Sequence, residues 1–247
     1  MLYRINPYFT LIASIASIVG LIITFCSDKN AVIIALISII VSLLILIFGF
    51  VSLIYKIIKQ NNKDEYSRIS SFFVFRSEDG VRSVFETYRL IQCKRPILTD
   101  IKYRYKWSGS VLPKMSSNNQ IIEQLPANND KDKWDSAIIR FKRPLMYNES
   151  TVLHIKTEND DSDNTAQPWL ECFVLSSIEI LQFRVMLGYK PDDYRQNAVF
   201  ERRKKDSDIG TNYEFLCHVP FEQTYKQYFH IYINPAPGYI YRLRWEK

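Results

Sequence analysis

An unbroken apolar run from Ala31 to Tyr55 constrains this chain more than any other feature of its sequence. No charged residue interrupts it. As a helix rising about 1.5 Å per residue it would be about 37 Å long, enough to cross a hydrocarbon core of roughly 30 Å. Because every backbone polar group in lipid must be bonded internally, a segment of this kind must be helical there. The sequence therefore predicts a transmembrane helix.

A second apolar run precedes the first. It extends from Phe9 to Phe25, which is near the lower length limit for a span, and only "CSDKN" separates the two runs. A cleaved signal peptide is the alternative, but no small-x-small cleavage site follows "LIITFCSDK". The sequence thus favours a transmembrane helical hairpin over residues 1–60.

Positive charges flank these runs. Arg4 precedes the first, and Lys56, Lys59 and Lys63 follow the second. By the positive-inside rule, both termini of the hairpin are expected in the cytoplasm. The formal net charge of the chain is +6, and the segment from Met1 to Gln60 carries half of it. The remaining mildly basic domain does not by itself require nucleic acid as a partner.

The hydrophobic period changes from helical to alternating after a polar linker at residues 61–70. In "DIKYRYKWSG", Tyr103, Tyr105 and Trp107 alternate with cations, as in a half-buried strand. About ten such short runs follow one another, separated by turn sequences such as "SEDG" and "NPAPG". Residues 71–247 are therefore expected to form an all-β antiparallel cytosolic domain, either a sandwich or a barrel.

Small residues mark one face of each apolar run. They include Ser17 and Gly20 in the first run and Ser38 and Ser42 in the second. Helices associate in lipid through small residues and interhelical hydrogen bonds, since lipid is as apolar as leucine. The two faces could meet within one hairpin, or they could form the interface or pore lining of a homo-oligomer. We expect a homo-oligomer.

Two basic clusters are the candidate ligand sites. "KYRYKW" contributes Lys102, Arg104 and Lys106, and "ERRKK" contributes Arg202 and Arg203. Cations beside aromatic rings are typical of sites that bind nucleotides or single-stranded nucleic acid. A solvated outer face and contact with anionic lipid headgroups are the alternatives.

The sequence displays no catalytic or metal-ligating constellation. Its three histidines have no partner at metal-ligand spacing, and no phosphate-binding, nucleophile-elbow or zinc-protease motif occurs. We expect neither enzyme activity nor a cofactor nor a metal.

The arrangement of two apolar runs, a polar linker and a β-rich domain resembles membrane effectors of bacterial anti-phage signalling. Similar in plan are the two-transmembrane β-barrel effectors of CBASS systems and the membrane effector of the Hailong system. The resemblance implies an inner-membrane protein that permeabilises the membrane when its β domain responds to a cyclic nucleotide or short oligonucleotide. It also implies a partner nucleotidyltransferase that makes this signal.

A different class of function fits the same features. The β domain could bind a protein partner while the membrane segment serves as a passive tether. The chain would then be a membrane-anchored protein-interaction module, and changes at Ser38 and Ser42 would not affect its function.

Overall fold

The computed structural model describes residues 17, 20, 29–61, 64–107, 109, 111–126, 134–205 and 212–247. The chain divides into two compact units, Met1–Asn61 and Asn62–Lys247.

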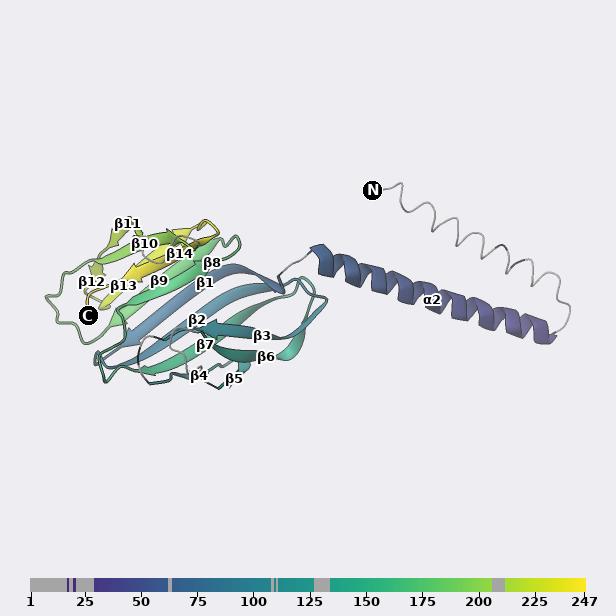
Figure 1. The fold of residues 1–247 in the computed structure, drawn as a ribbon, viewed down its shortest axis with the longest axis horizontal. Helices are drawn as coiled ribbons and strands as arrows, with labels where there is room; N and C mark the ends of the chain where they lie inside the picture. The colour runs from purple at the N-terminus through teal and green to yellow at the C-terminus, as the bar shows by residue number, and fades with distance from the viewer. Residues whose placement is uncertain are drawn as a thin grey trace. The chain divides into compact units, whose positions relative to one another are not determined.

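The first unit contains a long helix, α2, which spans Lys29–Asn61 (Figure 1). Its stretch from Val32 to Ile58 is long and apolar enough to cross a membrane. Large aliphatic and aromatic side chains are exposed along α2, and Phe48 is 76% exposed. A helix that is apolar around its circumference belongs in lipid or in a protein core, so the structure supports membrane association through α2.

The expectation of a two-helix hairpin is wrong for the part of the chain that the structure describes. There, α2 is the one helix that meets the length and hydropathy needed for a span. The expected first span, Phe9 to Phe25, lies outside the described residues except for Ser17 and Gly20, which are helical. The 27 residues from Val32 to Ile58 suffice for a crossing on their own. One candidate span therefore replaces the hairpin.

The second unit is β-rich, as the alternating pattern predicts, and its described part contains fourteen strands. The strands are β1 (Tyr66–Ser77), β2 (Arg82–Cys93), β3 (Ile97–Tyr105), β4 (Lys114–Ser116), β5 (Gln120–Gln124), β6 (Asp135–Met146), β7 (Ser150–Asp160), β8 (Trp169–Val174), β9 (Ile180–Leu187), β10 (Ala198–Lys204), β11 (Glu214–Val219), β12 (Phe221–Glu222), β13 (Gln227–Ile233) and β14 (Tyr239–Arg244).

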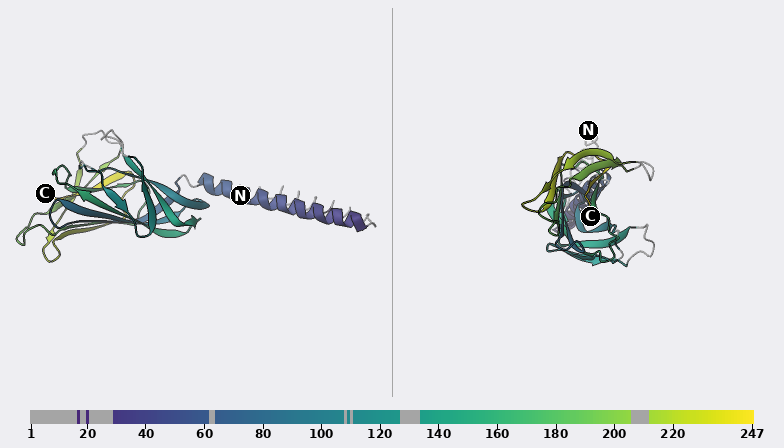
Figure 2. Two further views of the ribbon diagram at one scale, coloured as in Figure 1. Left: turned by 90° about the horizontal axis from the view of Figure 1, so that it is seen from below. Right: turned by 90° about the vertical axis from the view of Figure 1, so that its left-hand side faces the viewer.

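These strands form one large and two small sheets. The large sheet has seven strands in the order β12-β13-β9-β1-β2-β7-β4. The small sheets have the orders β11-β10-β14-β8 and β3-β6-β5. Figure 2 shows the sheets of this domain curving around a side that remains open.

Both small sheets pack on the same face of the large sheet. The first core joins the large sheet to the four-stranded sheet and includes Phe73, Phe183 and Phe200. The second core joins it to the three-stranded sheet and includes Ile91, Ile139 and Leu153. The register pairs Phe73 with Thr87 and Arg89 with Leu153, so these side chains share one face. The domain is thus a double sandwich with the middle of β1 and β2 between its two cores.

One strand pair departs from the antiparallel arrangement that we expected. β1 pairs with β9 in parallel, and Ser70 lies opposite Ile180. A parallel pair needs a long crossover between its strands, and here all the strands from β2 to β8 lie between them in sequence. This long-range pairing brings together segments that are far apart in the sequence, which local alternation cannot specify.

Candidate anion-binding site

The first half of β1 and the part of β2 that pairs with it, between the two cores, carry two arginines and two hydroxyl side chains. These are Arg68 and Ser71 on β1 and Thr87 and Arg89 on β2. Ser71 lies directly opposite Arg89 in the antiparallel register. We call these four residues the arginine site.

Arg89 is held between aromatic rings. Its guanidinium carbon lies 5.2 Å from the ring centre of Tyr103 on β3 and 5.9 Å from that of Phe73. Such cation–π contacts stabilise and orient the guanidinium without neutralising its charge. The Nε of Arg89 is buried and has no hydrogen-bond partner. The guanidinium of Arg89 is therefore held in place, but its Nε–H group has no hydrogen-bond acceptor.

Arg68 lies close enough to Arg89 for their charges to repel each other. Burial lowers the pKa of the Arg68 guanidinium, and the charge of Arg89 lowers it further. One terminal nitrogen of Arg68 donates to the carbonyl oxygen of Phe173 on β8 at 2.9 Å. Neither arginine forms an ion pair with a carboxylate in the described part of the chain. Two like charges held together without a counter-ion favour the binding of an anion.

The two hydroxyl groups of the arginine site are also without partners. Ser71 is 0% exposed and Thr87 is 1% exposed. Neither side-chain oxygen has a hydrogen-bond partner. A buried, unsatisfied polar group costs about 1–3 kcal/mol, and native interiors contain few of them. With the Nε of Arg89, the site holds three unsatisfied donors on one face of two adjacent strands. Such a cluster is unusual in a native protein.

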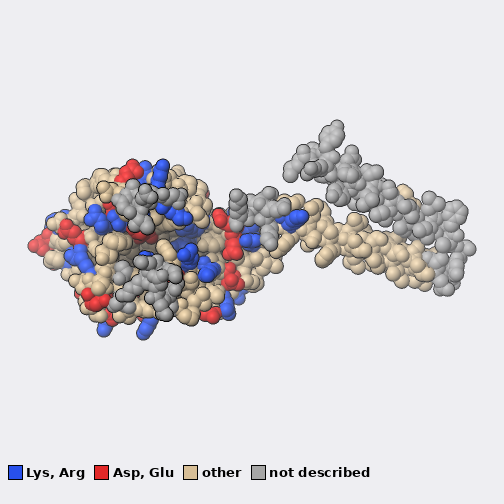
Figure 3. All heavy atoms as spheres, viewed as in Figure 1, with Lys and Arg blue, Asp and Glu red and all other residues tan. Residues whose placement is uncertain are grey.

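Two open strand edges flank the arginine site. β8 is an edge strand of the four-stranded sheet and β3 is an edge strand of the three-stranded sheet. Arg68 bonds to β8, and Arg89 contacts Tyr103 on β3. Figure 3 shows Lys and Arg side chains distributed over the face that it draws, with Asp and Glu among them.

The first basic cluster predicted from the sequence lies on another face of the domain. On β3, Ile101 and Tyr105 are buried, whereas Lys102 and Arg104 are exposed, as alternation predicts. Arg104 lies 5.9 Å from the ring centre of Trp134. Lys106 is exposed just beyond the end of β3. The side chains of Lys102 and Arg104 thus point away from the face of β3 that carries Tyr103 and contacts Arg89.

The second basic cluster is divided between two faces of β10. Arg202 forms an ion pair with Glu214 at 2.8 Å, and its guanidinium carbon lies 4.7 Å from the ring centre of Tyr239. Arg203 instead donates to the hydroxyl of Tyr213 at 2.9 Å. The two clusters therefore belong to different sheets, and the arginines of the second cluster already have partners within the chain.

The small residues expected at a helix interface lie in helical parts of the chain. Ser17, Gly20 and Ser38 are exposed, and Ser42 is partly exposed. Their role at an interface or in a pore stays a prediction.

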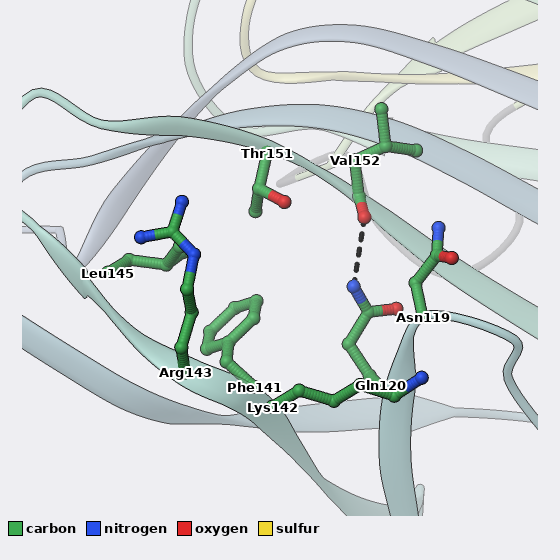
Figure 4. Close-up of a pocket in the computed structure, with 8 residues that line it drawn as sticks. All are labelled: Asn119, Gln120, Phe141, Lys142, Arg143, Leu145, Thr151 and Val152. Carbon is green, nitrogen blue, oxygen red and sulfur yellow. Dashed lines mark hydrogen bonds between the residues drawn. The ribbon is translucent and has the colours of Figure 1, made fainter.

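A polar pocket lies between the end of β6 and the start of β7 (Figure 4). It has a volume of about 370 Å³. Its cations already have partners: Lys142 donates to the carbonyl oxygen of Asn118 at 3.0 Å, and Arg143 pairs with Glu149. Gln120 donates to the carbonyl oxygen of Val152 at 2.9 Å. This pocket is consequently a weaker candidate for an anion than the arginine site.

Comparison with known proteins gives limited similarity. No protein-family profile and no curated protein matches the chain. Among solved structures, a two-domain M1 zinc metallopeptidase variant bound to L-tryptophan matches at 9% identity and a TM-score of 0.39, covering 73% of this chain and 43% of the other. An M1 zinc metallopeptidase from Deinococcus radiodurans matches at 12% identity and a TM-score of 0.35, covering 69% and 42%. The chain spans less than half the length of these structures, and likeness at this level assigns no activity to it.

Sequence reasoning missed the arginine site because its members are not clustered in sequence. Arg68 and Arg89 lie on different strands, and each is followed by apolar or hydroxyl residues. The sequence nevertheless contains a sign of this site, because a cation at a position of a strand that otherwise faces the core is unusual. In "SVFETYRLIQC", Arg89 falls on the same alternate positions as Phe85 and Ile91.

Proposed function

We propose that this protein is a membrane-anchored receptor whose β domain binds an anionic ligand at the arginine site. The observation that carries the proposal is the pair Arg68 and Arg89, which is partly buried and has no carboxylate partner among the described residues. α2 supplies the anchor, because Val32 to Ile58 is apolar enough to cross a bilayer. A nucleotide or short oligonucleotide, as the sequence resemblance implies, is one such anion.

The proposal differs from the expectation that Lys102, Arg104, Lys106, Arg202 and Arg203 bind the ligand. Arg202 and Arg203 already have partners, whereas Arg89 retains a buried donor without one. An added anion gains most where charge is uncompensated and the site is shielded from water. The arginine site meets both conditions.

Membrane permeabilisation, a place in anti-phage defence and a partner nucleotidyltransferase stay predictions from the resemblance, and a homo-oligomeric state stays a prediction from the small residues of the apolar runs. Dye uptake by living bacteria that express the full chain tests the first of these. Uptake that is abolished by Leu at Ser38 and Ser42 would support a pore, and uptake unaffected by both changes would contradict it.

The receptor proposal is tested with the full chain in neutral-lipid nanodiscs. Thermal unfolding is followed while adenosine monophosphate, a short oligonucleotide, malonate or an acidic peptide is added. A ligand at 100 times its Kd adds about 2.7 kcal/mol to stability, so at least one anion should raise the Tm by several degrees. Arg89→Gln should remove the shift, and Arg140→Gln, at an exposed cation paired with Glu123, should retain it. No shift with any anion would contradict the proposal.

A further inference from the structure

We infer that the anion recognised at the arginine site is a terminal phosphoryl group, a phosphate monoester dianion, rather than a phosphodiester or a carboxylate. This inference rests on the proposed receptor function and names the chemical class of its ligand. It follows from the charge, the number of free donors and the rigidity of the site.

The charge of the arginine site favours a ligand with two negative charges. Arg68 and Arg89 together carry two positive charges, and no carboxylate of the described residues pairs with either. A phosphate monoester carries about −1.5 to −2 charges at pH 7, whereas a phosphodiester or a single carboxylate carries one. A monoanion would leave one guanidinium uncompensated in a partly desolvated place, which is unfavourable.

The number of unsatisfied donors matches the oxygens of a terminal phosphoryl group. Three side-chain donors lack partners: the Nε of Arg89, the Oγ of Ser71 and the Oγ1 of Thr87. A phosphate monoester has three terminal oxygens, each a strong acceptor. A planar carboxylate has two oxygens, so at least two of these three donors would have to share one of them within the plane of the carboxylate. Guanidinium groups also bind phosphate through two parallel hydrogen bonds.

The aromatic rings around Arg89 make the site rigid. Tyr103 and Phe73 lie 5.2 Å and 5.9 Å from its guanidinium carbon, and they approach it from two different strands. Arg68 is fixed in turn by its bond to the carbonyl oxygen of Phe173. Groups that are already oriented lose less conformational entropy when they bind a ligand.

A terminal phosphoryl group could come from free phosphate, from a nucleotide or linear oligonucleotide with a phosphorylated end, or from a lipid headgroup. Isothermal titration of the full chain in phosphatidylcholine nanodiscs separates these sources. The soluble probes are inorganic phosphate, adenosine 5′-monophosphate, cyclic adenosine 3′,5′-monophosphate, adenosine and malonate. A parallel preparation contains phosphatidic acid in the nanodisc, and its ability to reduce phosphate binding is measured.

We expect adenosine 5′-monophosphate to bind about tenfold or more tightly than its cyclic diester, because one charge-assisted contact is worth roughly a factor of ten. Adenosine should not bind. Equal binding of monophosphate and inorganic phosphate would support the phosphoryl group as the recognised element. Competition by phosphatidic acid would support the same chemistry with a lipid source.

Two results would overturn the inference while leaving the receptor proposal intact: equal affinity for the cyclic diester, or affinity for malonate equal to that for phosphate. Binding of no anion at all would contradict both. Arg89→Lys, which keeps the charge but removes Nε, should weaken phosphate binding about tenfold, and Arg140→Gln should not. Circular dichroism of each variant confirms that the β domain is folded.

Discussion

At the scale of single residues, the buried hydroxyl of Thr87 should lower the stability of the folded chain. The side chain is 1% exposed and its oxygen has no hydrogen-bond partner. Burial of the hydroxyl therefore destabilises the folded state, because no hydrogen bond replaces those that the hydroxyl makes with water in the unfolded chain. Thr87→Val keeps the shape of the side chain and removes this oxygen. We expect the free energy of unfolding to stay the same or to rise by up to about 1 kcal/mol, measured by denaturant titration. A marked loss of stability would instead show that the hydroxyl has a partner in solution.

His230 is a second residue whose environment predicts a measurable effect. The centre of its ring lies 4.3 Å from the centre of the Phe200 ring. The Nε2 atom of His230 is buried and has no hydrogen-bond partner. Burial lowers the pKa of His230 from the ordinary value of 6.5. As the pH falls below about 6.5, the unfolded chain takes up a proton that the folded state resists. Stability should therefore decrease between pH 7.5 and 5.5.

The control for this effect is His230→Phe, which cannot titrate. Denaturant titrations at pH 7.5, 6.5 and 5.5 should show a smaller decrease for the variant than for the natural protein. Equal decreases in both proteins would assign the effect to other groups.

At the scale of elements, α2 is the candidate for membrane association, because Val32 to Ile58 is long and apolar enough to cross a bilayer. Many aliphatic side chains of α2 are exposed; Leu44 is 60% exposed and Ile45 is 67% exposed. A continuous exposed apolar surface of this kind is unfavourable in water. An arginine in the middle of a span costs about 2.5–3.5 kcal/mol for insertion. We expect Leu44→Arg with Ile45→Arg to move the protein from the carbonate-resistant membrane fraction to the soluble or aggregated fraction. Leu44→Ala with Ile45→Ala is the matched control and should remain in the membrane.

At the scale of the whole β domain, two cores share one continuous sheet. β1 and β2 pair over most of their length and contribute side chains to both cores. Disruption of either core should consequently unfold both. Phe183→Ala in the first core and Ile139→Ala in the second should each lower the free energy of unfolding by about 2–5 kcal/mol.

The measurement compares two probes of the same denaturant titration: far-ultraviolet circular dichroism, which reports on all the sheets, and tryptophan fluorescence, which includes Trp245 in the first core. Coincident transitions in both variants would confirm a single cooperative unit. Separate transitions would show that the two sandwiches unfold independently.

The sequence by itself determined what depends on local pattern. The apolar run Ala31 to Tyr55 lies within α2, because a charge-free segment of this length has no comparable alternative to a helix in lipid. The alternation around Tyr103 and Tyr105 determined which side chains of β3 face inward. Only the tertiary structure decided which strands are neighbours, including the parallel pairing of β1 with β9, and on which face the small sheets pack. It also brought Arg68 and Arg89 together, since the register between strands is set by long-range packing and a shift of one residue would turn a side chain to the opposite face.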